Sequence, residues 1–234
     1  MNYFEKNLVV GPFQCNCRIL VCPKTGEAAL IDPGDESGRI LDELGRIEWV
    51  GEDGRTRKPR LKWILHTHAH LDHIGGTRGV VDGIRPAGDG PPPAWIALHK
   101  EDLFIYESLR EQGRMFGLSY EDPLPVTKFL EHGERLEIGS LRIEVIHTPG
   151  HSPGSVGFRL YEDSELGAPE TVFSGDTLFK GSVGRTDLWG ADGDRMFEMI
   201  RERLLTLDGD TRVCPGHGPD STIGVEKREN PFLR

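Results

Sequence analysis

The sequence predicts a mixed α/β fold in which short strands alternate with amphipathic helices, and three observations lead to it. Short apolar runs bounded by proline and glycine are typical of strands. Between some of these runs, apolar residues recur at helical spacing, as Ile40, Leu41 and Leu44 do. Finally, several histidine and aspartate residues follow strand-like runs, and loops at strand ends are where rigid scaffolds present functional groups.

The first part of the chain is predicted to form strands and one helix. Strands are expected at residues 16–21 and 28–32, and the second ends in the turn signal Asp32-Pro33-Gly34. A helix is expected to begin at Ser37, where a serine precedes the first apolar residues of a helical face. A strand at 61–65 then leads directly into a histidine-rich segment.

The remaining elements alternate in the same way. A strand at 95–98 precedes an amphipathic helix at 101–112, whose buried positions we expect to be Leu103, Ile105, Tyr106 and Leu109. Four strands are predicted after it, at 135–138, 141–146, 155–160 and 171–173. A helix at 194–205 is expected to bury Met196, Phe197, Ile200 and Leu204, and a strand at 212–214 follows it.

A chain of 234 residues is long enough for one large domain with a sizeable core. We predict a single domain spanning residues 1–234. Two loop insertions are expected in it: the segment near 51–60 is polar, and the segment near 82–93 is rich in glycine and proline.

Charge and composition exclude several functions. The net charge of −10 argues against a nucleic-acid partner, because phosphate binding needs a basic surface. No apolar run has the length needed to span a bilayer, and the N-terminal residues do not resemble a secretion signal. We therefore expect no membrane partner and a cytoplasmic location. The four cysteines are interpreted as reduced, packed thiols, which suits a reducing compartment.

The most informative segment is His66-Thr67-His68-Ala69-His70-Leu71-Asp72-His73. Imidazole and carboxylate groups are common ligands of zinc, iron and manganese. Because His68 and His70 are alternate residues, their rings can converge on one ion in an extended loop. Asp72 and His73 are adjacent and point towards a second position. The segment therefore predicts parts of two metal sites.

Three further motifs complete the ligand supply: Pro149-Gly150-His151, Ser174-Gly175-Asp176 and Pro215-Gly216-His217. The Pro-Gly pairs predict tight turns that can aim His151 and His217. Asp176 ends an apolar run, and a carboxylate in that position can bridge two cations through its two oxygens. His66 and His147 precede the ligand motifs and are interpreted as packed or supporting groups, whereas His99 and His132 are expected at the surface.

These motifs resemble those of the metallo-beta-lactamase superfamily, and in particular its short, single-domain, bacterial glyoxalase II-like hydrolases. The resemblance extends from about residue 16 to the end of the chain. Besides the ligand motifs, four segments carry it: Asp32-Pro33-Gly34, Arg114-Met115-Phe116-Gly117-Leu118, Gly181-Ser182-Val183-Gly184-Arg185-Thr186-Asp187 and Asn230-Pro231-Phe232-Leu233.

The resemblance implies a four-layer αββα sandwich with a dinuclear metal site at one edge of the paired sheets. It assigns one metal to His68, His70, His151 and Asp176, and the other to Asp72, His73, His217 and the shared Asp176. It also implies that a metal-bridging hydroxide cleaves a small thioester such as S-lactoylglutathione, a glutathione conjugate. Asp72 would hold a metal and orient the hydroxide, and Asp32 would support a ligand from behind.

Some alternatives remain open at this stage. The ligand types suit two divalent ions, with zinc favoured over iron or manganese. A mononuclear iron persulfide dioxygenase and a lactonase use the same scaffold; the dioxygenases share a Gly-Arg-Thr-Asp-like loop, but their last motif usually reads Pro-Ala-His. Arg185 and Asp187 could contact the substrate or could simply pair with each other.

Overall fold

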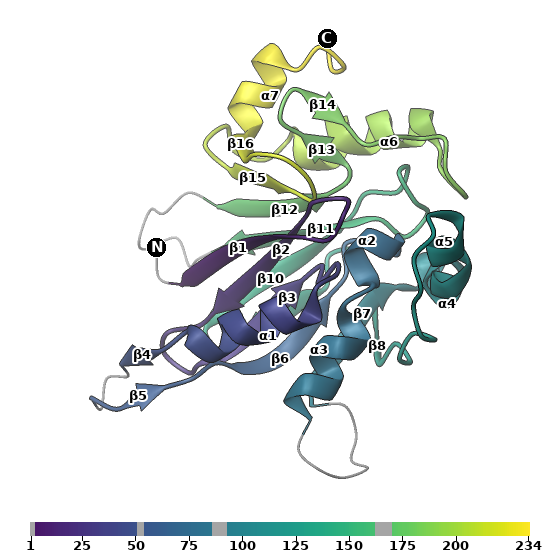
Figure 1. The fold of residues 1–234 in the computed structure, drawn as a ribbon. Coiled ribbons are helices and arrows are strands. Elements are labelled where there is room, and N and C mark those ends of the chain that lie inside the picture. Colours follow the sequence, from purple (N-terminus) through teal and green to yellow (C-terminus); the bar gives the residue numbers. More distant parts are fainter. Residues whose placement is uncertain (1–2, 51–53, 86–92, 162–169) are drawn as a thin grey trace.

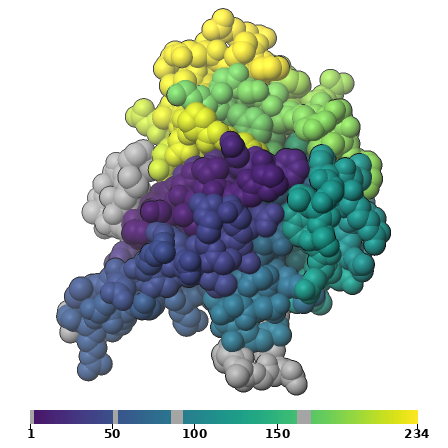
Figure 2. All heavy atoms as spheres, viewed as in Figure 1, coloured from purple at the N-terminus to yellow at the C-terminus, as the bar shows by residue number. Residues whose placement is uncertain are grey.

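The computed structural model describes residues 3–50, 54–85, 93–161 and 170–234. Two six-stranded sheets lie face to face, and helices cover the outer face of each (Figure 1). This is the four-layer αββα arrangement that the resemblance implied. Figure 2 shows how closely the two halves pack: the purple and blue N-terminal half lies directly against the green and yellow C-terminal half.

The first sheet has the strand order β1-β2-β3-β6-β7-β8. Strands β1 to β3 pair antiparallel, whereas β3, β6, β7 and β8 run parallel to one another. Its strands are β1 (Phe4–Val10), β2 (Cys15–Val21), β3 (Glu27–Ile31), β6 (Arg60–Leu65), β7 (Trp95–His99) and β8 (Lys128–Leu130).

The second sheet has the order β16-β15-β12-β11-β10-β9. Most of its neighbours are antiparallel, but β12 and β15 run parallel, so both end at the same edge. Its strands are β9 (Arg135–Ile138), β10 (Leu141–His147), β11 (Val156–Tyr161), β12 (Thr171–Gly175), β15 (Arg212–Pro215) and β16 (Ser221–Thr222). Two short hairpins lie outside the sheets: β4 (Trp49–Val50) with β5 (Thr56–Arg57), and β13 (Leu178–Phe179) with β14 (Ser182–Val183).

The helices divide between the two outer faces. The first sheet is covered by α1 (Ser37–Arg46), α2 (Leu71–Ile74), α3 (Thr77–Ile84), α4 (Leu103–Glu107) and α5 (Leu109–Met115), with a 3-10 turn, η1 (Lys100–Asp102), before α4. The second is covered by α6 (Gly193–Met199), a π-helical continuation η2 (Ile200–Leu204) and α7 (Ile223–Glu229).

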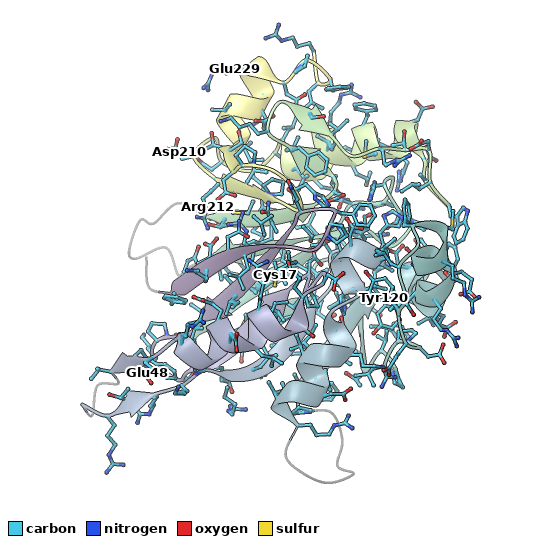
Figure 3. All side chains as sticks on the ribbon, in the orientation of Figure 1. Cys17, Glu48, Tyr120, Asp210, Arg212 and Glu229 are labelled. Carbon is cyan, nitrogen blue, oxygen red and sulfur yellow. The ribbon has the colours of Figure 1, made fainter. Side chains whose placement is uncertain are left out.

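Three apolar layers hold these elements together. Because successive strand residues point to opposite faces, Ile19 of β2 packs under the helices while its neighbour Leu20 packs between the sheets. Cys17 faces the helices with Ile19 and lies inside the molecule in Figure 3. The third layer, between the second sheet and α6, η2 and α7, includes Val172, Met196 and Ile223.

Most predicted elements appear within a residue or two of their expected limits, but two helices differ. The helix expected at 101–112 is broken at Ser108, whose hydroxyl donates to the carbonyl oxygens of Phe104 and Ile105 and so competes with the helical pattern. The helix expected at 194–205 changes to π-helical geometry at Ile200. Phe197 is half-buried there, and Met199 takes the buried position instead.

The structure describes parts of both predicted insertions. The described part of the segment near 51–60 contains β5, which pairs with β4 in a hairpin that projects from the body of the molecule (Figure 1). The loop expected from residue 82 begins later, because α3 continues to Ile84. At Gly83 an added Cβ would lie 2.3 Å from Leu41, so this glycine lets α1 pack closely on α3. Residues 51–53 and 86–92 lie outside the described part of the chain.

No helix among the described residues is both long and apolar enough to cross a membrane.

Candidate metal centre

The predicted ligands meet at the edge where several strands end. The segment after β6 carries His68 and His70, and α2 follows it with Asp72 and His73. The loop between β10 and β11 carries His151. Asp176 directly follows β12, and His217 follows the parallel strand β15. Parallel strands deliver their carboxyl ends to one edge, which explains why residues so distant in sequence converge.

The first group consists of three imidazoles. His151 Nε2 lies 3.2 Å from His68 Nε2 and 2.9 Å from His70 Nδ1. Nitrogens bound to one zinc ion at about 2.0–2.1 Å are about 3.3 Å apart in a tetrahedral site. The three nitrogens therefore have nearly the separations that a shared ion requires.

The second group lies beside the first. His73 Nε2 and His217 Nε2 are 3.2 Å apart, and Asp72 Oδ2 lies 3.1 Å from His217 Nε2 and 3.7 Å from His73 Nε2. Two imidazoles and one carboxylate thus face a common point.

Asp176 lies between the two groups. Its Oδ1 is 3.4 Å from His73 Nε2, and its Oδ2 is 3.7 Å from His151 Nε2 and 3.6 Å from His217 Nε2. Oδ1 is buried and has no hydrogen-bond partner among the described residues. A buried carboxylate oxygen without a partner is costly unless a cation faces it. The Asp176 carboxylate is therefore placed where it could bridge two ions.

The remaining nitrogens of the imidazoles fix the ring orientations. His73 Nδ1 lies 3.0 Å from Asp32 Oδ2, His151 Nδ1 lies 2.8 Å from the carbonyl oxygen of Arg185, and His217 Nδ1 lies 3.2 Å from that of Gln14. Because these partners accept hydrogen bonds, each Nδ1 donates, and Nε2 is the nitrogen that each ring could offer to an ion. The residues present thus fit two divalent cations.

The charge states of His68, His70 and Asp176 suit metal binding, whereas neighbouring acidic groups outweigh burial and raise the pKa of His73 and His217, so these two rings would release a proton when an ion binds. Burial and the neighbouring imidazoles hold the pKa of His68 well below its ordinary value and lower that of His70 to about 3, so both rings are neutral at pH 7. Burial alone would raise the pKa of Asp176, but His73, His151 and His217 hold it below its usual range. Neutral imidazoles and ionised carboxylates are the forms that bind metals.

Asp32 supports the centre from behind. Its carboxylate accepts hydrogen bonds from Thr67 N and Thr67 Oγ1, both at 2.7 Å, as well as from His73 Nδ1. Its φ of 50° is left-handed, a conformation that non-glycine residues adopt at a cost and often at functional sites. Through these contacts Asp32 joins the His73 ring to the start of the segment that carries His68 and His70.

Close backbone approach at the last motif depends on Gly216. A Cβ there would lie 2.2 Å from Asp176 Oδ1 and 2.7 Å from His73 Cε1. Asn16 fastens the same loop, since its side-chain amide donates to the carbonyl oxygens of Pro215 and Gly218. Pro-Gly-His therefore marks a turn that lies against the centre itself.

Two supporting residues escaped the sequence analysis. Asp102, fully buried at the end of η1, accepts from Ala69 N, Ser152 Oγ and Gly154 N, and so joins the loop of His68 and His70 to the loop of His151. Gln112 of α5 accepts from Leu71 N and donates to the carbonyl oxygens of Ala69 and Ile105. Asp102 follows strand β7 just as the candidate ligands follow their own strands. This position after a strand is the feature of the sequence from which its role could have been predicted.

The ring of Tyr120 packs closely against the end of the helix that carries Asp72 and His73. An added Cβ at Gly75, after α2, would lie 2.6 Å from the Tyr120 ring, and one at Gly113 of α5 would lie 2.7 Å from it. In Figure 3 the tyrosine lies beside these helices. Its hydroxyl donates to Asp35 Oδ2 at 3.1 Å, which fixes the ring.

The other histidines lie outside the ligand groups. His66 is fully buried, with Nδ1 3.0 Å from the carbonyl oxygen of Ala97 and Nε2 2.8 Å from Thr77 Oγ1. His132 is exposed, as expected. His99 was also expected at the surface, but it is half-buried because its ring stacks on that of His147, with centroids 4.0 Å apart.

His66 makes the fold sensitive to acid. Burial lowers its pKa from 6.5 to about 4, so protonation favours the unfolded chain. The stability that its neutral form contributes is complete above pH 6.5 and is lost as the pH falls towards 4, at up to about 1.4 kcal/mol per pH unit. In urea unfolding of metal-free protein between pH 7 and pH 5, we expect the wild type to lose about 1–2 kcal/mol more than His66→Gln does. Equal losses would contradict this assignment.

Arg185 and Asp187 pair with each other. Arg185 Nε and Nη2 donate to the two Asp187 carboxylate oxygens at 2.7 and 2.8 Å, and both side chains are exposed. Arg185 also lines the cavity described next, whereas Asp187 is not among its lining residues.

A cavity of about 290 Å³ opens over the two ligand groups. Five of the candidate ligands form part of its lining: His70, Asp72, His151, Asp176 and His217. The rest of the wall is largely apolar and includes Phe13, Met115, Phe116 and Trp189. A small molecule in this cavity would therefore touch the candidate metal positions directly.

Comparison with known proteins gives consistent matches along the chain. A family model described as the metallo-beta-lactamase superfamily matches residues 10–217. Hydroxyacylglutathione hydrolase GloC of Haemophilus influenzae is 37% identical over 227 residues, which cover 96% of this chain and 95% of that protein.

Two solved structures are similar over nearly the same extent. The crystal structure of TTHA1623 in a di-iron-bound form has a TM-score of 0.76 and 41% identity, covering 97% of this chain and 100% of that one. The BLEG-1 B3 metallo-beta-lactamase has a TM-score of 0.80 and 34% identity, covering 98% of this chain and 99% of that one. The similarity therefore includes the whole sandwich and not the ligand motifs alone.

Proposed function

The chain belongs to the metallo-beta-lactamase superfamily, and on that premise we propose that it is a dinuclear metal-dependent hydrolase of the glyoxalase II type, cleaving a thioester such as S-lactoylglutathione. One observation carries the proposal: seven potential ligands converge in two groups, with the Asp176 carboxylate between them. The similarity to a hydroxyacylglutathione hydrolase supports the thioester as the bond that is cleaved.

The proposed ligands divide as the geometry suggests. His68, His70 and His151 would hold one ion and Asp72, His73 and His217 the other, with Asp176 shared. Nitrogen and carboxylate ligands suit zinc, iron and manganese. We propose zinc as the resident metal; the di-iron-bound form of TTHA1623 shows that a similar protein accepts iron.

When bound, two such ions supply an acidified water as nucleophile and stabilise the negative charge that develops on the thioester carbonyl oxygen. Asp72 lines the cavity, and His73 and His217 offset the effect of burial so that its pKa stays below the ordinary value. Its carboxylate is therefore ionised at pH 7 and can accept a hydrogen bond from the attacking water. Asp32 keeps His73 oriented throughout by holding its Nδ1 proton.

The proposal is tested by thiol release combined with elemental analysis. We expect the metal-loaded protein to contain close to two ions per chain and to release thiol from S-lactoylglutathione. Chelation should abolish thiol release, and re-addition of zinc should restore it, because the ligands remain in place. If the fully loaded protein releases no thiol from this or any other acyl thioester, the proposal fails.

The same preparation distinguishes the rival reaction. Oxygen uptake with glutathione persulfide, together with one iron per chain, would identify a dioxygenase. Hydrolysis of a homoserine lactone in preference to every thioester would identify a lactonase.

A further inference from the structure

The wall of the cavity that faces the candidate ligands is apolar and exposed. The exposed fractions of its large side chains are 37% for Phe13, 66% for Met115, 53% for Phe116 and 51% for Trp189. They come from the turn between β1 and β2, from α5 and its end, and from the segment before α6. Three separate parts of the chain thus place apolar surface around one opening, and such patches mark sites that another molecule covers.

The polar side chains of the same wall are already engaged. Gln112 uses its amide oxygen for Leu71 N and its amide nitrogen for two carbonyl oxygens. Arg185 donates to both carboxylate oxygens of Asp187. Apart from the candidate ligands, the side chains of the described lining therefore leave one polar group free to bind a substrate, the indole N–H of Trp189, and no cation.

The charge of the lining argues in the same direction. A glutathione conjugate carries two carboxylates at pH 7, which need cations or several hydrogen-bond donors when they bind. Arg185 is the one Lys or Arg among the described lining residues, and its charge is balanced by Asp187. With a net charge of −10, the protein as a whole does not attract anions.

The apolar wall is also joined to the centre. Phe13 packs edge-to-face on Phe116, with ring centroids 5.1 Å apart, so the two rings form one surface. The turn that carries Phe13 is closed by a hydrogen bond from Gln14 N to the carbonyl oxygen of Gly11, at 3.1 Å. The carbonyl oxygen of Gln14 in turn accepts from His217 Nδ1. One turn therefore positions both the wall and a candidate ligand.

We propose that the preferred substrate is a thioester with an apolar alkyl or aryl group next to the scissile bond, and that this group lies on the wall formed by Phe13, Met115, Phe116 and Trp189. This rests on the proposed thioester hydrolysis and specifies its substrate class. The glutathione head then contributes little to binding, and chain length on the apolar side determines selectivity.

Binding of uncleavable analogues tests this without relying on catalysis. S-alkyl thioethers of N-acetylcysteamine, from methyl to octyl, are titrated into metal-loaded protein by calorimetry, alongside S-methylglutathione. We expect affinity to rise roughly two- to fourfold for each methylene that is buried. The inference is overturned if affinity does not rise with chain length, or if the glutathione head raises it more than the longer chain does.

Substitutions in the wall test whether the rise of affinity with chain length arises there. Phe13→Ala and Phe116→Ala should each reduce the ratio of octyl to methyl affinity by at least fivefold. Phe129→Ala provides a matched control, since Phe129 is 39% exposed on β8 and does not line the cavity. It should leave the ratio unchanged. If Phe129→Ala lowers the ratio as much as Phe13→Ala, binding is not specific to the wall and the inference fails.

Hydrolysis separates failure of this inference from failure of the proposed function. The kcat/KM of S-acyl N-acetylcysteamines should rise from acetyl to octanoyl and exceed that of S-lactoylglutathione. If no thioester is cleaved while affinity still rises with chain length, the proposed function fails and the ligand class stands. If thioesters are cleaved but S-lactoylglutathione is preferred over the whole series, the hydrolase stands and the apolar preference is overturned.

Discussion

Replacing Asp176 with asparagine is expected to lower kcat/KM for thioester hydrolysis by at least about 1,000-fold, an order of magnitude beyond the loss typical of a group that only supports a ligand. The amide keeps the shape of the side chain but loses its charge, and its nitrogen cannot bind a cation. Because the Asp176 carboxylate faces His73, His151 and His217, the substitution would remove the negative charge that we propose the two metal positions share, and would leave a single oxygen in place of two. Elemental analysis should show fewer than two ions per chain.

Asp210→Asn is the matched control, because Asp210 is exposed and lies in the turn before β15. It should retain full activity and two ions. Wild-type activity in Asp176→Asn, with both ions retained, would show that the carboxylate does not bridge them. Thermal unfolding of the metal-free proteins completes the comparison. Because His73, His151 and His217 hold the pKa of Asp176 below its usual range, loss of its charge should destabilise the metal-free variant. Activities are therefore compared only at temperatures at which thermal unfolding shows that both proteins are folded.

The alternation of strands and helices was predictable because its information is local, whereas the four-layer arrangement was implied by the resemblance alone. In β6 and β7 the apolar runs are bounded by turn residues, and in α1 the helical face of Ile40 and Leu44 is complete. The interruptions of the predicted helices were not predictable in the same way. Ser108 interrupts a continuous apolar face through hydrogen bonds of its own side chain, and such a choice between competing bonds leaves no trace in hydrophobic periodicity.

The candidate site was likewise predictable only in part. Its candidate ligands could be proposed from the sequence because histidine and aspartate follow strand-like runs in short motifs, and parallel strands bring such positions together. The cavity wall could not be found, because Phe13, Phe116 and Trp189 are single residues in three unrelated segments. Met115 and Phe116 did belong to a segment that resembled the family, but nothing in the sequence placed them beside Phe13. Contacts of this kind depend on tertiary packing.

Asp102 holds two ligand-bearing loops together, mainly through hydrogen bonds to their backbone. We expect Asp102→Ala to have the second-largest effect on the protein, after Asp176→Asn. Its carboxylate accepts from Ala69 N at 2.9 Å, Ser152 Oγ at 2.7 Å and Gly154 N at 2.6 Å. Each buried donor left without an acceptor costs about 1–3 kcal/mol. Burial raises the pKa of Asp102, so removing its charge recovers part of that cost. We therefore expect a net loss of about 3 kcal/mol in the free energy of unfolding, measured by urea denaturation of metal-free protein.

The effect should extend to the metals, because these hydrogen bonds join the loop that carries His68 and His70 to the loop that carries His151. Competition with a chelator should reveal a metal affinity lower by about 10–100-fold. Asp102→Asn should lie between alanine and wild type, since its oxygen can serve Ala69 N and Ser152 Oγ while its amide group opposes Gly154 N. The neighbouring Glu101 has a side chain 59% exposed, so Glu101→Gln should change neither quantity. A loss of stability in Asp102→Ala with unchanged metal affinity would mean that the two loops hold their ligands without it.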